Sequence, residues 1–155
     1  MLDRGDGFEA LYEAQHDRLV RAAALMTGST AAAEDMVQEA FAKLHLRWGR
    51  VDEPAAWLRT VVMNSAKNEL RRSSVRRRFL ERNGPRAVTA HLDQPVNEIV
   101  HSLRRLPARQ RAVVVLRYYE DLPEAEIAEL LGIRLGTVKS ALHRALEALR
   151  NEVPR

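Results

Sequence analysis

The chain of 155 residues contains no cysteine, and aromatic side chains make up only 5% of it. The lack of cysteine excludes disulfide scaffolds, thiolate zinc sites and cysteine nucleophiles, and it fits a reducing cytoplasm. No apolar run approaches the ~20 residues that span a bilayer, and the opening MLDRGDGFEA lacks the pattern of a signal peptide. We therefore expect neither a secreted protein nor one inserted in a membrane.

Several kinds of catalytic motif are also missing. The sequence has no Gly-rich phosphate loop and no GxSxG elbow. The adjacent carboxylates Glu34 and Asp35 lie on a predicted helix that has another explanation, so they do not predict the catalytic pair of a glycosidase. No histidine pair has metal-ligand spacing on a helix with a carboxylate partner; the five are His16, His45, His91, His101 and His143. We predict that the chain is not an enzyme and that it binds neither a metal ion nor a cofactor.

The excess of positive charge is confined to one stretch of the chain. Residues 1–70 carry 8 basic and 11 acidic side chains, residues 71–90 carry 7 and 1, and residues 91–155 carry 10 and 9. A local run of cations can bind phosphates by releasing counterions, which makes nucleic acid a candidate partner. A solvated linker without a partner is the alternative that composition leaves open.

Apolar residues recur at three- and four-residue steps over residues 8–26, 33–44, 57–62 and 96–116, which predicts an all-α fold. No segment alternates like a strand between hairpin turns. Pro54 suits the first turn of the third helix, and we expect Asp52 to cap it. Periodicity is lost over residues 73–94. We predict two small helical domains, 1–80 and 95–155, joined by a basic linker, 81–94.

The strongest motif is DLPEAEIAELLGIRLGTVKSALHRALEALR, residues 121–150, which predicts a helix-turn-helix in the C-terminal domain. Gly132 supplies the turn, where a positive φ costs little only for glycine. At 100° per residue, Val138 and Leu142 face the core, and Thr137, Ser140 and Arg144 lie nearly opposite, with Gly136, Ala141 and His143 beside them. Such a helix can enter the major groove of DNA, although an ordinary helical hairpin is the alternative.

With its three motifs taken in order, the chain resembles a bacterial RNA polymerase sigma factor of the extracytoplasmic-function (ECF) group, in the sigma-70 family. The motifs are AEDMVQEAF at 33–41, AWLRTVVMNSAKNELRR at 56–72 and the segment that contains GTVKS. The resemblance covers nearly the whole chain and is weakest over residues 73–94. It implies a protein that binds core RNA polymerase and directs promoter binding, melting and transcription initiation.

The resemblance assigns partners to two segments of the N-terminal domain. The first motif is similar to the helix that docks on the β′ clamp of the polymerase, which makes its acidic and amide side chains candidate contacts: Glu34, Asp35, Gln38 and Glu39. The second is similar to the part that reads and opens the −10 promoter element, with candidates Asn64, Lys67, Asn68, Arg71 and Arg72. Trp57 could stack on a base or belong to the core.

In the C-terminal domain the resemblance implies that the second helix of the motif reads the −35 element. The candidate contacts are Arg134, Thr137, Lys139, Ser140, His143 and Arg144. Two positions depart from the family pattern. Arg134 stands where a capping Ser is frequent, and it has no oxygen that could accept the free amide hydrogens. Ala141 stands where Arg is frequent, which we expect to remove a guanidinium from the flank of the reading face.

The implied partners are core RNA polymerase, through its β′ clamp and β subunits, and promoter DNA, in the bacterial cytoplasm at the nucleoid. An anti-sigma factor is a further partner that the resemblance allows. Two alternatives remain at this point: a stand-alone helix-turn-helix regulator that does not bind polymerase, and a helical module that binds only proteins. The regulator usually needs an α/β receiver domain, and residues 1–94 show neither its strands nor its acidic pocket.

Overall fold

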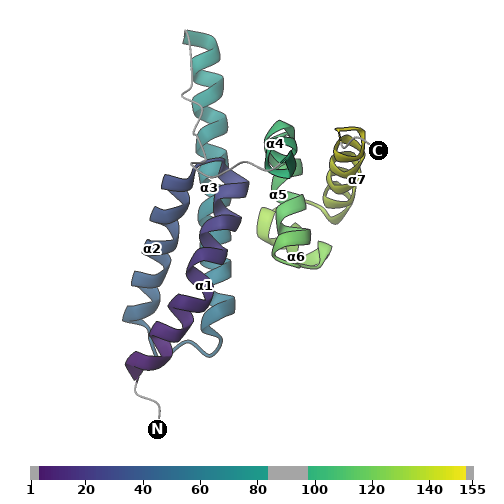
Figure 1. Cartoon of the computed structure of the whole chain (residues 1–155). Coiled ribbons are helices and arrows are strands. Elements are labelled where there is room, and N and C mark those ends of the chain that lie inside the picture. The colour runs from purple at the N-terminus through teal and green to yellow at the C-terminus, as the bar shows by residue number, and fades with distance from the viewer. Residues whose placement is uncertain (1–3, 84–97, 153–155) are drawn as a thin grey trace.

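A computed structural model describes residues 4–83 and 98–152, and every regular element in these ranges is a helix (Figure 1). The predicted all-α fold is confirmed. The N-terminal domain consists of α1 (Arg4–Thr27), α2 (Thr30–Leu46) and α3 (Pro54–Asn83). The C-terminal domain consists of α4 (Glu98–Arg105), α5 (Ala108–Val114), the π-helical turn η1 (Val115–Tyr119), α6 (Glu124–Leu131) and α7 (Leu135–Glu152).

Glycine and serine make the corner between α1 and α2. Gly28 has φ +77° and donates its N–H to the Ala24 carbonyl at 2.8 Å, which ends α1 in the left-handed conformation that suits glycine. Ser29 then caps α2, its hydroxyl accepting from the Ala32 N–H at 3.1 Å. The two helices therefore fold back on each other, and α3 packs against both.

The long helix α3 begins at Pro54, as the sequence predicts, but its cap is not the expected residue. The Glu53 carbonyl accepts the Trp57 N–H at 3.0 Å, so Glu53 and not Asp52 holds the N-cap position. The helix continues to Asn83, three residues into the predicted linker 81–94, and its C-terminal part projects past α1 and α2 (Figure 1). The rest of the predicted linker lies outside the described residues.

The predicted helix-turn-helix is confirmed in α6 and α7. Gly132, with φ +65°, donates to the Glu129 carbonyl at 3.3 Å, and the next residue, Ile133, donates to Ala128 at 3.1 Å. These two bonds form a Schellman motif, which satisfies two carbonyls at the end of α6 and turns the chain toward α7. Val138 is wholly buried between the helices, and Ile133 packs against the core.

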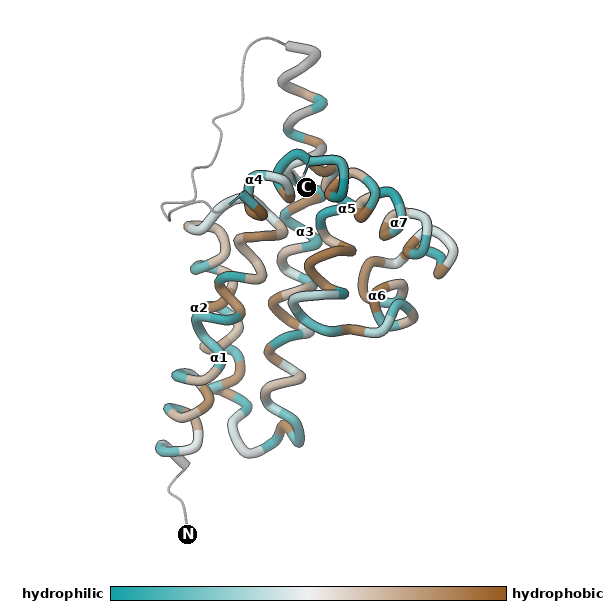
Figure 2. Tube along the Cα trace, turned by 45° about the vertical axis from the view of Figure 1, so that its right-hand side comes forward, coloured by the Kyte–Doolittle hydropathy of each residue, from teal (hydrophilic) through white to brown (hydrophobic). Residues whose placement is uncertain are grey.

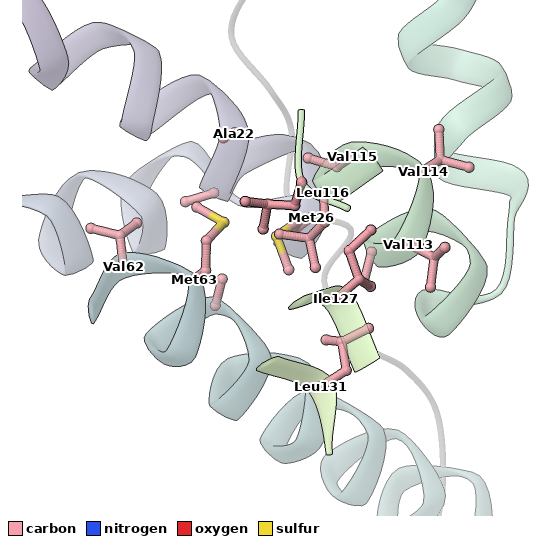
Figure 3. Packing of buried hydrophobic residues seen from close by; sticks show 14 of the residues in the cluster. Ala22, Met26, Val62, Met63, Val113, Val114, Val115, Leu116, Ile127 and Leu131 are labelled. Atoms are coloured by element: carbon pink, nitrogen blue, oxygen red, sulfur yellow. The ribbon is translucent and has the colours of Figure 1, made fainter. Parts of the chain in front are cut away.

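One apolar core extends through both domains. Along each helix hydrophobic stretches alternate with hydrophilic ones (Figure 2), and the hydrophobic faces meet. Helix α1 packs against α4, α5 and η1, and α3 packs against α6. Figure 3 shows Met26 and Met63 of the N-terminal domain beside Leu116 and Ile127 of the C-terminal domain, all fully buried. The two domains are therefore docked on each other in this structure.

No helix in the described ranges combines the length and the hydropathy that a membrane-spanning segment requires.

Candidate nucleic-acid and partner interfaces

The candidate polymerase contacts form one exposed face of α2. Apolar residues on the opposite face of the helix, from Ala33 to Leu44, fill the core of the N-terminal domain. Because they recur at three- and four-residue steps, the residues between them point to solvent. The side chains of this exposed face are Glu34, Asp35, Gln38 and Glu39. Lys43 lies 3.1 Å from Glu39, a surface ion pair that leaves Glu34 and Asp35 as the uncompensated charges of the face.

Two residues of α1 hold Gln38 in place. The Gln38 amide nitrogen lies 2.9 Å from the Tyr12 hydroxyl and 3.4 Å from His16 Nε2. The Tyr12 and His16 rings stack with their centroids 4.8 Å apart, and Tyr12 also packs against Phe41. The stack restricts Tyr12 and thus fixes the hydrogen bond that orients the amide. Sequence periodicity could not identify this pair, because both residues belong to the stripe of α1 that packs on α2.

The candidate −10 contacts lie along one face of α3, but the structure divides them into two groups. Asn68, Arg71 and Arg72 are exposed, whereas Asn64 and Lys67 are half-buried against the C-terminal domain. Lys67 Nζ donates to the Leu130 carbonyl at 3.0 Å. Trp57, whose ring could stack on a base, is half-buried and packs against the core, with the Arg47 guanidinium 5.8 Å from its ring centroid.

A groove of about 460 Å³ separates the face of α3 from the C-terminal domain. From α3 it is lined by Arg59, Thr60, Met63, Asn64 and Lys67, and from the other side by Leu122, Glu126, Glu129 and Leu130. Cations of α3 thus face two carboxylates of α6. A phosphate backbone would likewise present negative charges to the cations of α3.

The candidate −35 contacts lie at the start and along the exposed side of α7. Arg134 directly precedes the helix, and its carbonyl accepts the Val138 N–H at 3.1 Å, so it holds the cap position without supplying a side-chain cap. Thr137 is half-buried. The remaining candidates are exposed: Arg134, Lys139, Ser140, His143 and Arg144.

The prediction that Ala141 lies on the flank of the exposed face of α7 is wrong. The side chain is buried, with 7% of its surface exposed, and does not lie on the flank of the exposed face. Because α7 packs against both α5 and α6, the buried arc of the helix is wide enough to include Ala141. A methyl group fits this arc, so alanine at this position is explained by packing and not by a guanidinium missing from the surface.

Among the residues that the structure describes, three cations join the two domains, each close to the end of a helix. Lys67 donates to Leu130 at the end of α6, and Arg111 Nε donates to the Met26 carbonyl near the end of α1, at 3.0 Å. Arg18 Nη2 lies 3.5 Å from the Tyr119 carbonyl at the end of η1. The last carbonyls of a helix lack intrahelical partners and carry the negative end of its dipole, so a cation stabilises them.

Glu120 is the one buried charged residue in the described part of the chain, at 3% exposure. The turn η1 and the positive φ of Asp121, 56°, direct it into a cleft at the domain interface, which Arg18 and Arg59 also line. Burial raises its pKa above the ordinary value, and the charges of Arg18 and Arg59 only partly offset this effect. Its Oε1 lies 4.0 Å from Arg18 Nε and has no hydrogen-bond partner.

Among the described residues, no group of three or more His, Cys, Asp and Glu side chains could hold a metal ion. His16 and His45 pack against aromatic rings, whereas His101 and His143 are exposed. His91 lies outside the described residues.

Both halves of the chain match known protein families. Residues 11–76 match the family described as Sigma-70 region 2, and residues 97–149 match Sigma-70, region 4. The chain is 33% identical over 153 residues to the RNA polymerase sigma-E factor of Streptomyces coelicolor, covering 94% of this chain and 85% of that protein. It is 40% identical over 157 residues to the ECF RNA polymerase sigma factor SigL of Mycobacterium tuberculosis, covering 91% and 85%.

The fold is also that of a solved structure. The sigma factor RpoE of Bartonella quintana, in complex with the anti-sigma factor NepR, matches with a TM-score of 0.66 and 21% identity, over 97% of this chain and 98% of that one.

Proposed function

The chain belongs to the ECF group of RNA polymerase sigma factors, in the sigma-70 family, and we propose that three helical faces divide the work of such a factor. The protein binds core RNA polymerase and directs it to promoters. The observation that carries this function is the presence of regions 2 and 4, in order, on one chain. A stand-alone helix-turn-helix regulator is ruled out by the region 2 match over residues 11–76.

The exposed face of α2 is the proposed polymerase contact. Its carboxylates and the oriented Gln38 amide suit a basic partner helix, which the resemblance places on the β′ clamp. What supports this assignment is that apolar packing leaves only this face of α2 open, while α2 packs against α1 and α3 with its other side.

The proposed DNA contacts are the polar face of α3 for the −10 element and that of α7 for the −35 element. On α3, the amides of Asn64 and Asn68 read base edges, and Lys67, Arg71 and Arg72 hold phosphates. On α7, Arg144, Ser140 and Lys139 lie on the exposed side of the second helix of the motif, which enters the major groove.

Sigma factors are regulators of transcription, and we propose that this chain catalyses no reaction by itself. The chemistry of transcription belongs to the core enzyme. Since its partners are polymerase and the chromosome, we place the protein in the bacterial cytoplasm, at the nucleoid.

The experiment that tests the function is run-off transcription with purified core polymerase, with polymerase binding measured in the same preparations. Wild-type protein is expected to select start sites. The double variant Asp35→Ala and Gln38→Ala is expected to bind polymerase roughly tenfold more weakly, since it loses one charged and one neutral contact. It should unfold at the wild-type temperature, because both side chains are exposed.

Asp52→Ala is the matched control, because it also removes one exposed negative charge from the N-terminal domain. It should bind polymerase like the wild type. Equal affinity of the double variant and the wild type would disprove the assignment of α2. A wild-type protein that neither binds polymerase nor changes start-site selection would disprove the function itself.

A further inference from the structure

The first turn of α7 contains a glycine that the fold itself does not require. Gly136 is helical and exposed, and it does not have the positive φ of Gly28 or Gly132. A Cβ added to it would meet no atom of the described residues within 4 Å, whereas at Gly7 of α1 a Cβ would meet the Trp48 ring at 3.3 Å. Because glycine destabilises a helix relative to alanine, neither conformation nor packing explains its presence here.

Gly136 lies on the same side of α7 as the proposed −35 contacts. Ser140, His143 and Arg144 follow it at steps of four, seven and eight residues, and all of them are exposed. In a helix that enters the major groove, the residues of the first turns contact the base edges. Gly136 thus occupies a position from which a side chain would point to DNA.

The neighbours of Gly136 form a low apolar patch between two cations. Leu135, directly before it, leaves 43% of its surface exposed although it is large and apolar. Arg134 and Lys139, on either side of this pair in the sequence, are exposed and carry positive charge. Cations that hold phosphates position a duplex without reading it, so the two would draw the DNA against the patch.

We propose that Gly136 is a specificity-determining residue of the −35 interface, because its missing side chain lets the major-groove edge of a base pair lie against the backbone of α7. The proposal rests on the proposed role of α7 in reading the −35 element. It gives Gly136 a function that opposes stability: alanine should stabilise the free protein and weaken its complex with DNA.

The short side chains of the reading face support a close approach. Ser140 carries its hydroxyl one carbon from the backbone, so it can reach a base edge only where α7 lies deep in the groove. A methyl group at Gly136 would hold the first turn of the helix away from the DNA. Since a hydrogen bond tolerates only a few tenths of an ångström, the contact of Ser140 would be lost with it.

The chain offers a matched control in α1. Gly5, like Gly136, is the second residue of its helix, is exposed, and has no atom of the described residues within 4 Å of an added Cβ. It belongs to none of the proposed binding faces. An open helical glycine is therefore not in itself a binding residue, and comparing the two positions measures what the location on α7 adds.

The test uses holoenzyme assembled from core polymerase and each of four variants: Gly136→Ala, Gly136→Leu, Gly5→Ala and Gly5→Leu. Alanine and leucine both favour helices, so the pair varies size at little cost to the fold. Binding is measured with a fluorescein-labelled duplex of a promoter mapped by run-off transcription, and with the same duplex after its −35 element is scrambled. Thermal unfolding of the free proteins is measured in parallel.

Gly136→Ala is expected to unfold at a higher temperature than the wild type and to bind the intact promoter roughly tenfold more weakly, as overpacking by one methyl group predicts. Gly136→Leu should bind more weakly still. On the scrambled duplex both should equal the wild type. Gly5→Ala should also gain stability, and neither Gly5 variant should lose affinity for either duplex.

A double-mutant cycle with Ser140→Ala tests the mechanism. In the wild-type background this change should weaken binding to the intact promoter, whereas after Gly136→Ala it should have little further effect, because the contact is already lost. Full additivity of the two losses would show that Gly136 does not set the depth of α7, and it would overturn the proposal.

Two further results would overturn it. If Gly136→Ala binds the intact promoter as tightly as the wild type, the complex has room for a methyl group and the DNA does not lie against Gly136. If the variant loses as much affinity for the scrambled duplex, the effect does not arise at the −35 element. A wild-type holoenzyme that does not distinguish the two duplexes would instead disprove the proposed role of α7 itself.

Discussion

At the scale of single residues, the interfaces depend on partners that are distant in sequence. Gln38 takes its orientation from Tyr12, 26 residues earlier, and Lys67 takes its position from Leu130, 63 residues later. Such hydrogen bonds contribute little to the total stability, but they fix which atoms a partner meets. Substitution of the residue that orients such a side chain should therefore change the affinity of that side chain's surface for its partner.

Tyr12→Phe is expected to weaken polymerase binding by about 1 kcal/mol, because it removes the hydroxyl that orients Gln38 and keeps the ring that packs on Phe41. Binding to core polymerase, measured with the thermal unfolding temperature, checks this expectation. In a Gln38→Ala background the same change should have no effect, since nothing is left to orient. An equal loss in both backgrounds would assign Tyr12 a direct contact instead.

Arg144→Ala is expected to weaken initiation that depends on the −35 element by about 1–3 kcal/mol if its guanidinium contacts a base. The side chain is exposed on α7, so its loss should not affect the fold. Run-off transcription measures the effect, and a template with a scrambled −35 element is the control, on which the variant should equal the wild type. An unchanged yield on the intact promoter would contradict the role.

At the scale of elements, local signals explain most of what the sequence could predict. Gly28 and Gly132 end helices with positive φ, and Pro54 begins one, because each residue fits one backbone conformation. The π-helical bonds of η1 have no such local signal, since the apolar run near Leu116 fits an α-helix equally well. The sequence predicts Ala141 beside the exposed face because a helical wheel of α7 alone cannot show that both α5 and α6 pack against this helix.

The turn of the helix-turn-helix offers a matched pair of glycine variants. Gly132→Ala should lower the free energy of unfolding by about 1 kcal/mol, because an added Cβ would meet no atom but φ +65° strains an L residue. Gly136→Ala should raise it by about 0.5–1 kcal/mol, because Gly136 is helical and its surroundings are also open. Urea unfolding followed by circular dichroism measures both, and equal signs for the two variants would contradict the assigned turn.

At the scale of the whole molecule, the docking of the domains could not be predicted from periodicity. The hydrophobic stripes of α1 and α3 indicate that these helices are buried on one side, but not that Met26 and Met63 meet residues of a second domain. The contacts that define the interface join segments that are far apart in the chain, and their geometry depends on every element between them. Resemblance to a family gives the function of each domain without giving this arrangement.

Glu120 makes the stability of the docked molecule depend on pH. Burial raises the pKa of Glu120 above 4.5 in the docked state. Between the pKa of the unfolded chain and the raised pKa of the docked protein, the docked protein therefore binds more protons than the unfolded chain. Stability from this group is therefore fully present below pH 4.5 and is lost as the pH rises through the raised pKa. At pH 7 the buried charge is a cost that Arg18 and Arg59 only partly offset.

Glu120→Gln should therefore raise the unfolding temperature at pH 7, by about 2–4 °C for each kcal/mol of burial cost removed. The advantage should shrink as the pH approaches 4.5, where the wild-type carboxyl also becomes neutral. Glu147→Gln, which neutralises an exposed carboxylate of α7, controls for the change in net charge and should show neither effect. If Glu120→Gln is less stable than the wild type at pH 7, attraction to the two arginines outweighs burial, and docking should then weaken, not strengthen, on acidification.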